Sequence, residues 1–181
     1  MDRPSGTVSF LFTDIVGSTR VWESHPQEMR KVLADHERIL RSVFEEQGGY
    51  VFATGGDSFS VAFRTPDAAI RAALAGQQDL ADGPFEKVGG LAVRMAIHTG
   101  LAEERDGDYF GPPLNRVARM LSVAHGGRIV VSQTVAAMVR YSLPDGTHLR
   151  DMGSCPASRF PTRTGRFSIN SATDPAASPI Q

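Results

Sequence analysis

The sequence predicts an α+β fold built on a ferredoxin-like β-α-β-β-α-β core. Three observations lead to this prediction: short apolar runs with period-two alternation, amphipathic stretches with helical spacing between them, and glycine turns that separate the runs. The predicted elements follow the order strand 7–14, helix 22–47, strands 50–52 and 58–63, helix 67–80 and strand 91–97. In this topology the first and third strands are antiparallel neighbours at the centre of the sheet.

The first strand ends at Asp14. Val8, Phe10 and Phe12 share one face of it, and the other face is partly apolar, which is typical of a central strand. Residues 15–19, Ile-Val-Gly-Ser-Thr, then supply a glycine turn and hydroxyl side chains that can cap a helix. A carboxylate at a strand end, followed by N–H groups at a helix start, suits a cation and the phosphates it carries. Taken alone, Asp14 is more often a turn or cap residue.

A second carboxylate follows the helix predicted at 22–47, in which His36 falls within the apolar stripe. Asp57 begins the third strand inside the tight turn 55–57. The topology brings Asp14 and Asp57 to one edge of the sheet, where two carboxylates repel each other unless a cation lies between them. Gly-Asp is also common turn chemistry, so Asp57 alone reads as a hairpin residue. The joint placement favours a metal site.

Beyond the core, residues 102–111 predict a charged hairpin, and residues 112–124 predict a helix that begins with two prolines. Asn115 and Arg119 are four positions apart in that helix, so they project from one face, opposite an apolar stripe. Spacing alone favours a solvated helix face for this pair. A catalytic role for Asn115 and Arg119 does not follow from their spacing alone.

The last third of the chain predicts fewer elements. A strand at 128–131, a helix capped by Ser132 and a final strand around residues 167–169 are expected. Prolines then stand among Ser, Thr and Ala without apolar periodicity. We expect one domain over residues 1–170 and a disordered tail over 171–181.

Composition excludes several classes of function. The chain has 181 residues, 41% hydrophobic residues and a net charge of −1, without the basic excess of a nucleic-acid binder. It has no apolar stretch near the roughly 18–20 residues that span a bilayer, and no start typical of a signal peptide. Its single cysteine, Cys155, excludes an internal disulfide. We therefore expect a cytoplasmic protein with no nucleic-acid or membrane partner.

With these residues placed, the chain resembles the catalytic domain of the class III nucleotidyl cyclases, particularly the bacterial and actinobacterial adenylate cyclases. The resemblance extends from about Gly6 to Met152, and no single motif in it is specific. Five motifs in family order carry it: Phe12-Thr-Asp-Ile-Val-Gly-Ser-Thr19, Thr54-Gly-Gly-Asp57, Arg94-Met-Ala-Ile-His-Thr-Gly100, Asp108-Tyr-Phe-Gly111 and Asn115-Arg-Val-Ala-Arg119.

The resemblance implies a homodimer that converts ATP to 3′,5′-cyclic AMP and pyrophosphate. Two domains pack head to tail in such enzymes, and each of two equivalent sites uses residues of both subunits. Asp14 and Asp57 would hold two Mg²⁺ or Mn²⁺ ions in each site. From the partner, Asp108 would accept a hydrogen bond from the adenine amino group, Asn115 would orient the ribose, and Arg119 would neutralise charge on the α-phosphoryl group.

The resemblance also implies contacts to the triphosphate. The backbone N–H groups of Ile15, Val16, Gly17 and Ser18 would bind it, with Arg94 as a further phosphate contact. The reaction is an in-line attack of the ribose 3′-hydroxyl on the α-phosphorus, so catalysis is mostly positioning and charge stabilisation.

Two positions depart from the family pattern. Adenylate cyclases carry a lysine that helps read adenine where this chain has Ala53. A lost hydrogen bond to a charged donor costs roughly 1.5–3 kcal/mol, about 10- to 150-fold, so we expect weakened use of ATP and relaxed base selectivity. Asp108 remains and position 53 offers no carboxylate for guanine, which argues against a guanylate cyclase. For the usual lysine on the terminal phosphate, the chain offers only arginines, namely Arg159, Arg163 and Arg166.

Two alternatives stay open. A degenerate cyclase-like module that binds nucleotide or dimerises without turnover is favoured by Ala53, whereas the retained set of Asp14, Asp57, Asn115 and Arg119 argues against it. A diguanylate cyclase is suggested by Gly55-Gly-Asp-Ser-Phe59, but serine follows Asp57 where that family has glutamate.

Overall fold

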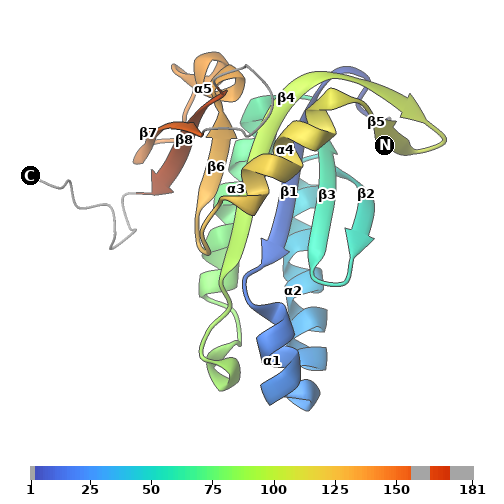
Figure 1. Cartoon of the computed structure of the whole chain (residues 1–181), viewed down its shortest axis with the longest axis vertical. Helices are drawn as coiled ribbons and strands as arrows, with labels where there is room; N and C mark the ends of the chain where they lie inside the picture. The colour runs from blue at the N-terminus through green and yellow to red at the C-terminus, as the bar shows by residue number, and fades with distance from the viewer. Residues whose placement is uncertain (1–2, 156–163, 172–181) are drawn as a thin grey trace, which may run out of the picture.

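The computed structural model describes residues 3–155 and 164–171, which form one mixed sheet with helices on both faces (Figure 1). The strand order is β2-β3-β1-β4-β6-β8-β7, and β5 pairs with β4 alone. The predicted β-α-β-β-α-β core is confirmed. It consists of β1 (Gly6–Ile15), α2 (Pro26–Glu46), β2 (Tyr50–Gly55), β3 (Ser58–Phe63), α3 (Pro66–Ala81) and β4 (Val93–Arg105).

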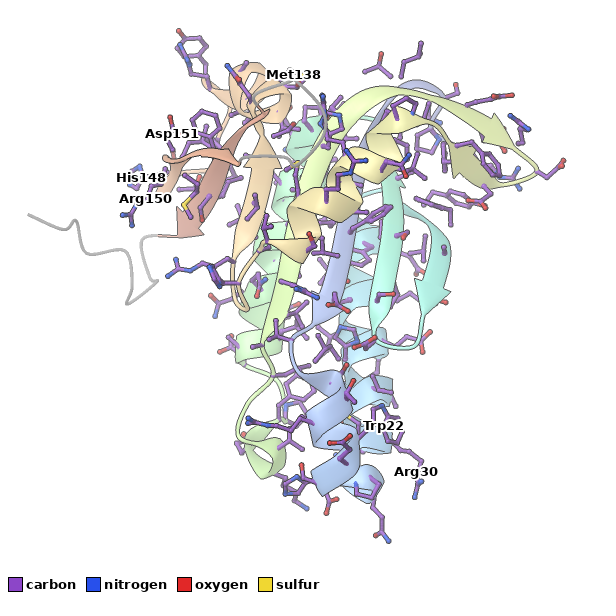
Figure 2. All side chains as sticks on the ribbon, in the orientation of Figure 1. Trp22, Arg30, Met138, His148, Arg150 and Asp151 are labelled. Carbon is purple, nitrogen blue, oxygen red and sulfur yellow. The ribbon has the colours of Figure 1, made fainter. Side chains whose placement is uncertain are left out.

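Helices α2 and α3 cover one face of the sheet (Figure 1). The long helix predicted at 22–47 is two helices, α1 (Ser18–Ser24) and α2, which are separated at His25. Pro26 causes the break, because the residue before a proline avoids the helical region, and His25 has φ −141° and ψ 61°. No residue of α1 is buried, and Trp22 lies partly exposed on it (Figure 2).

The predicted hairpin beyond the core is confirmed as an arm. Strand β4 continues beyond the amino-terminal end of β1. It turns at Asp106 and Gly107, which both have positive φ, into β5 (Asp108–Phe110). The hydroxyl of Tyr109 donates to the carbonyl of Pro4 at 2.7 Å. The arm is thereby fastened beside the amino-terminal end of β1.

Helix α4 (Pro112–Ser122) covers the other face of the sheet (Figure 1). Val117 and Met120 are buried against the strands with Ala124, and Leu121 is partly buried, as the apolar stripe predicted; Pro113 at the helix start is buried as well. Gly100 of β4 lies directly beneath Pro113, since a Cβ atom at Gly100 would sit 2.8 Å from Pro113 Cγ. The missing side chain lets the start of α4 approach the sheet closely.

The carboxyl-terminal elements complete the sheet. Strand β6 (Ile129–Ser132) runs parallel to β4, and Ser132 caps α5 (Gln133–Val139) by accepting from the N–H of Val135, as predicted. The predicted final strand is β8 (Thr164–Ser171), which pairs with β6. Strand β7 (Thr147–Cys155) was not predicted. The short turn η1 (Glu86–Val88) precedes β4, and the predicted tail lies almost wholly in residues 172–181, outside the described residues.

Candidate functional site

The carboxyl end of β1 brings Asp14 close to the turn that carries Asp57. Thr13 of β1 pairs with Phe59 of β3, so the next step of the ladder puts Asp14 opposite Ser58, beside Asp57. The backbone N–H of Phe59 also donates to Thr13 Oγ1 at 3.3 Å, which ties the two strand ends together. Both aspartates therefore lie at one edge of the sheet, as the topology predicted.

Asp14 forms an ion pair with Arg94, its ladder partner on β4. The Nε and Nη2 atoms of Arg94 both donate to Oδ2 of Asp14, the first at 2.8 Å. The two side chains retain 30% and 23% of their exposure, so solvent and ions reach them. A cation bound at this carboxylate would compete with the guanidinium, which would then be released near any phosphate that the cation carries.

A buried histidine lies behind the Asp57 turn. His36 of α2 is 1% exposed, and its ring centroid is 5.7 Å from that of Phe59. Burial lowers the pKa of His36 to about 4, while the negative charges of Asp57 and Glu37 act to raise it. The sequence placed His36 in the apolar stripe of a helix and gave no sign that it approaches Asp57.

The loop that follows Asp14 fits an anion only in part. The N–H of Val16 donates to the carbonyl of Ala92 at 2.8 Å, so this group already has a partner within the chain, and its contact with phosphate stays a prediction. Ile15 is buried and completes the strand. Gly17 takes a left-handed conformation with φ 73° and caps α1 without any side-chain hydrogen bond, so no hydroxyl caps this helix. The N–H groups that begin α1, from Ser18 on, point along the axis of that helix.

Ala53 and Asp108 fall in one region on the face covered by α4. The rings of their neighbours Phe52 and Tyr109 meet at 5.0 Å, edge to face. Both Ala53 and Asp108 are exposed, and Asp108 Oδ1 accepts from the N–H of Tyr109 at 2.7 Å. A purine that enters this region would meet the exposed carboxylate of Asp108 and no hydrogen-bond donor at position 53.

Asn115 and Arg119 are exposed on the outer side of α4, away from the buried stripe. The structure therefore places the pair together on one face, as predicted, and directs that face away from its own sheet. Asp108 stands beside the amino-terminal end of β1, whereas Asp14 and Asp57 stand at its carboxyl end. Each chain thus carries two separate groups of site residues.

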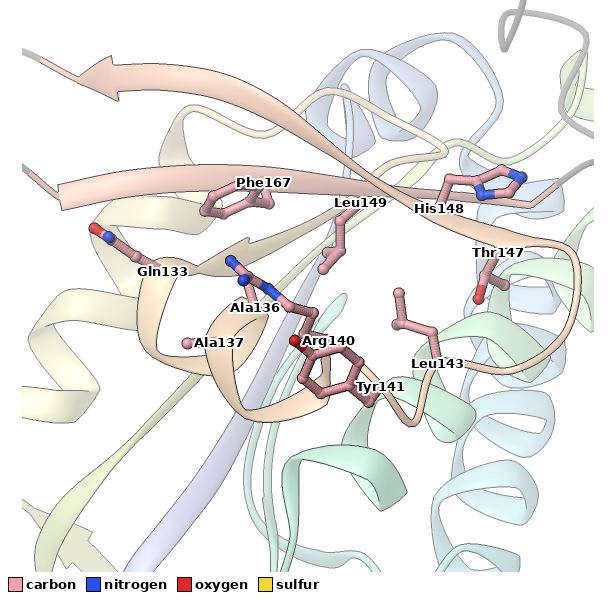
Figure 3. Close-up of a pocket in the computed structure, with 10 residues that line it drawn as sticks. All are labelled: Gln133, Ala136, Ala137, Arg140, Tyr141, Leu143, Thr147, His148, Leu149 and Phe167. Atoms are coloured by element: carbon pink, nitrogen blue, oxygen red, sulfur yellow. The ribbon is translucent and has the colours of Figure 1, made fainter.

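Other features lie apart from these groups. A pocket of about 570 Å³ between α5, β7 and β8 (Figure 3) is at the opposite edge of the sheet from β2, and none of the predicted site residues lines it. Arg159 and Arg163 lie outside the described residues, as does the side chain of Arg166. None of the helices in the described part of the chain is long and apolar enough to cross a bilayer.

The sequence and the fold both match known proteins. Residues 2–156 match the family model described as "Adenylate and Guanylate cyclase catalytic domain". An adenylate cyclase of Schizosaccharomyces pombe is 36% identical over 161 residues, which cover 75% of this chain and 10% of that protein. An uncharacterized protein of Mycobacterium tuberculosis is 34% identical over 161 residues, which cover 87% of this chain and 54% of that protein. The chain thus spans about half or less of the length of these relatives.

Solved structures agree with the sequence matches. A Trypanosoma brucei adenylate cyclase, described in its monomeric state, superposes with a TM-score of 0.83 and 25% identity, over 96% of this chain and 94% of that one. A protein from Silicibacter pomeroyi described as "Adenylate/Guanylate Cyclase/Hydrolase" gives a TM-score of 0.79 and 25% identity, over 90% and 95%. The adenylyl cyclase CyaB of P. aeruginosa, at 20% identity and TM-score 0.79, shows the same fold.

Proposed function

The chain belongs to the adenylate and guanylate cyclase catalytic-domain family, and from this premise we propose that it is a metal-dependent adenylate cyclase. It would convert ATP to 3′,5′-cyclic AMP and pyrophosphate in a homodimer. The observation that carries the proposal is the convergence of Asp14 and Asp57 at one edge of the sheet, apart from an outward-facing Asn115 and Arg119. The relatives named as adenylate cyclases support ATP as substrate.

The donor set suits Mg²⁺ or Mn²⁺. Carboxylate oxygens are the ligands these ions prefer, and Mg²⁺ is usually held by one or two carboxylates with phosphates and water completing the shell. Within residues 3–155 and 164–171 no cluster of three or more His, Cys, Asp or Glu side chains occurs, so nucleotide oxygens and water would supply the other ligands. When bound, two such ions would acidify the attacking hydroxyl and neutralise the leaving pyrophosphate.

The remaining residues would position the nucleotide. The carboxylate of Asp108 accepts from the adenine amino group, Asn115 orients the ribose, and the planar fork of Arg119 contacts the α-phosphoryl group as its charge grows. Arg94, once displaced from Asp14, has the charge and the location to contact the phosphates. In-line geometry at the α-phosphorus then depends on holding the ribose and the triphosphate together.

A second copy of the chain explains why the site residues fall into two groups. Two copies related by a twofold axis bury the same surface on each, so one copy's Asp14 and Asp57 can face the other's Asp108, Asn115 and Arg119. Both α4 residues are exposed on the side of the helix that faces away from its own sheet. Two equivalent shared sites follow from the symmetry.

Ala53 favours weak activity, and it is the observation behind a second candidate function. A module that binds nucleotide without turnover would also lack the donor at this position. The complete set of Asp14, Asp57, Asn115 and Arg119 favours the enzyme. The diguanylate cyclase alternative has no support from the family match.

Mixing two inactive variants tests the proposal. Wild-type chain with Mn²⁺ and ATP should form cyclic AMP, identified by chromatography that separates it from cyclic GMP and cyclic di-GMP, and Asp57→Ala and Arg119→Ala should each abolish it. In the mixed dimer one site carries both lesions and the other neither, so equal amounts should recover about a quarter of the wild-type turnover.

The matched control mixes Asp57→Ala with the double variant Asp57→Ala/Arg119→Ala, in which no site is intact. No recovery in verified heterodimers would refute the shared site. Nucleotide binding without any cyclic product from the wild-type chain would establish the non-catalytic module.

A further inference from the structure

We propose that His36 is a positioning residue for Asp57: its imidazole Nε2–H donates a hydrogen bond to the Asp57 carboxylate when that carboxylate ligates a divalent cation. The inference rests on the proposed metal site. It assigns a role to a side chain that no motif of the family resemblance includes.

The first support is an unsatisfied group. Nε2 of His36 is buried and has no hydrogen-bond partner among the described residues. Leaving a buried polar atom unpaired costs about 1–3 kcal/mol, so a native protein that keeps one needs a reason to do so. A leucine would fill the same stripe of α2 without this cost.

The second support is location. The ring of His36 packs on Phe59, two residues after Asp57, at the point where β3 leaves the turn. Asp57 is half-buried and close enough for its charge to act on the pKa of His36. A neutral imidazole carries one N–H, and the partner of that N–H decides which ring nitrogen holds the proton.

The third support is that a carboxylate which binds a metal ion needs a hydrogen-bond donor to orient it. Ligating carboxylates are usually oriented by hydrogen bonds from a second layer of residues, and removing such a partner typically weakens metal binding 10- to 100-fold. Asp57 follows Gly55 and Gly56 in its turn, and neither glycine has a side chain that could donate a hydrogen bond to the aspartate. A fixed donor on the buried side would hold its free oxygen while the other faces the cation.

The other buried histidine of the core shows the contrast. His98 of β4 has the same low pKa of about 4, but its Nδ1 is paired with the hydroxyl of Ser132 at 2.9 Å. His98 therefore has a structural partner within its own sheet. His36 is the buried histidine whose ring nitrogen stays unpaired in the described part of the chain.

The test is direct Mn²⁺ binding in the presence of a non-hydrolysable ATP analogue, with free Mn²⁺ followed by its electron paramagnetic resonance signal. We expect His36→Leu to weaken Mn²⁺ binding about 10-fold or more and His36→Gln to restore most of it, because a glutamine amide reaches the Nε2 position. Leu40→Ala, one turn along the same buried stripe, is the matched control: it should lower the unfolding temperature without changing the Mn²⁺ affinity.

Each outcome decides one question. Wild-type affinity in His36→Leu, together with lost affinity in Asp57→Ala, overturns the inference and keeps the metal site. Unchanged affinity in Asp57→Ala overturns the metal site itself. If His36→Leu fails to fold, His36→Gln is compared with His36→Asn, whose shorter amide cannot reach; equal Mn²⁺ affinities for these two would refute the inference.

Discussion

Position 53 lies on the exposed part of β2, beside the Phe52 ring that meets Tyr109. A lysine there would add one charged donor to the region that holds Asp108. We expect Ala53→Lys to raise kcat/KM for ATP about 10- to 150-fold, the value of one hydrogen bond from a charged donor. Steady-state assays with ATP and GTP measure both the gain and the new base preference.

Ala53→Met is the matched control for that substitution, because methionine matches the length of the lysine stem without its donor. Equal gains from Met and Lys would mean that added contact area, and not adenine recognition, causes the effect. An unchanged kcat/KM for ATP in Ala53→Lys would show that the adenine does not bind beside position 53.

At the scale of residues, the sequence predicts which side chains strand order brings together, and it misses contacts that depend on how a helix packs on the sheet. Asp14 and Asp57 come together because strand order alone decides which ends meet. The proximity of His36 to Asp57 depends on how α2 rotates over β3, and periodicity cannot distinguish a histidine that fills space from one that approaches a carboxylate. A loop sequence also does not reveal which of its N–H groups already has a carbonyl partner, as the Val16 N–H has.

Helix α4 depends on one close contact for its position. Its amino-terminal end rests on Gly100 through Pro113, and Asn115 lies just beyond. We expect Gly100→Ala to push this end of α4 away from the sheet and to lower the free energy of unfolding by about 1–3 kcal/mol. Because Asn115 moves with the helix, we also expect a lower turnover of ATP. Denaturant unfolding and cyclase assays measure the two effects separately.

A second substitution shows whether that contact is the cause. Pro113→Ala removes the Cγ atom 2.8 Å from the added methyl group, so the double variant Gly100→Ala/Pro113→Ala should regain part of the lost stability. Strictly additive losses would contradict the steric explanation.

Elements with local signals were predicted best. The hairpin arm, the proline start of α4 and the Ser132 cap each follow from a few adjacent residues. Strand β7 was missed because charged residues such as Arg150 and Asp151 interrupt any apolar alternation in it. The break between α1 and α2 was missed because apolar spacing continues across Pro26, whose backbone restriction outweighs that pattern.

The stability of the whole molecule should fall in mild acid. The pKa of His36 and that of His98 are both lowered to about 4 in the folded state by burial; Asp57 and Glu37 partly oppose this at His36, and Arg116 adds to it at His98. Between pH 6.5 and 4 the unfolded chain binds up to two protons that the native chain does not. Stability should therefore decrease as the pH falls through this range, by up to about 2.7 kcal/mol per pH unit for the two rings together.

Urea unfolding at a series of pH values measures this dependence. Replacing either ring by glutamine should remove about half of the slope that the histidines cause, and the remaining slope belongs to carboxylates. A slope unchanged by both replacements would show that the rings are not held neutral in the native state.

Strand β4 has one further consequence. It carries Arg94 against Asp14 near one end and the arm with Asp108 beyond the other, so a single continuous rod joins the two halves of each protomer. In the proposed dimer those halves serve different pockets. In the proposed dimer, a displacement of β4 caused by nucleotide binding at one active site would also move the residues that the same strand contributes to the second active site. Nucleotide binding at the two sites would then be cooperative.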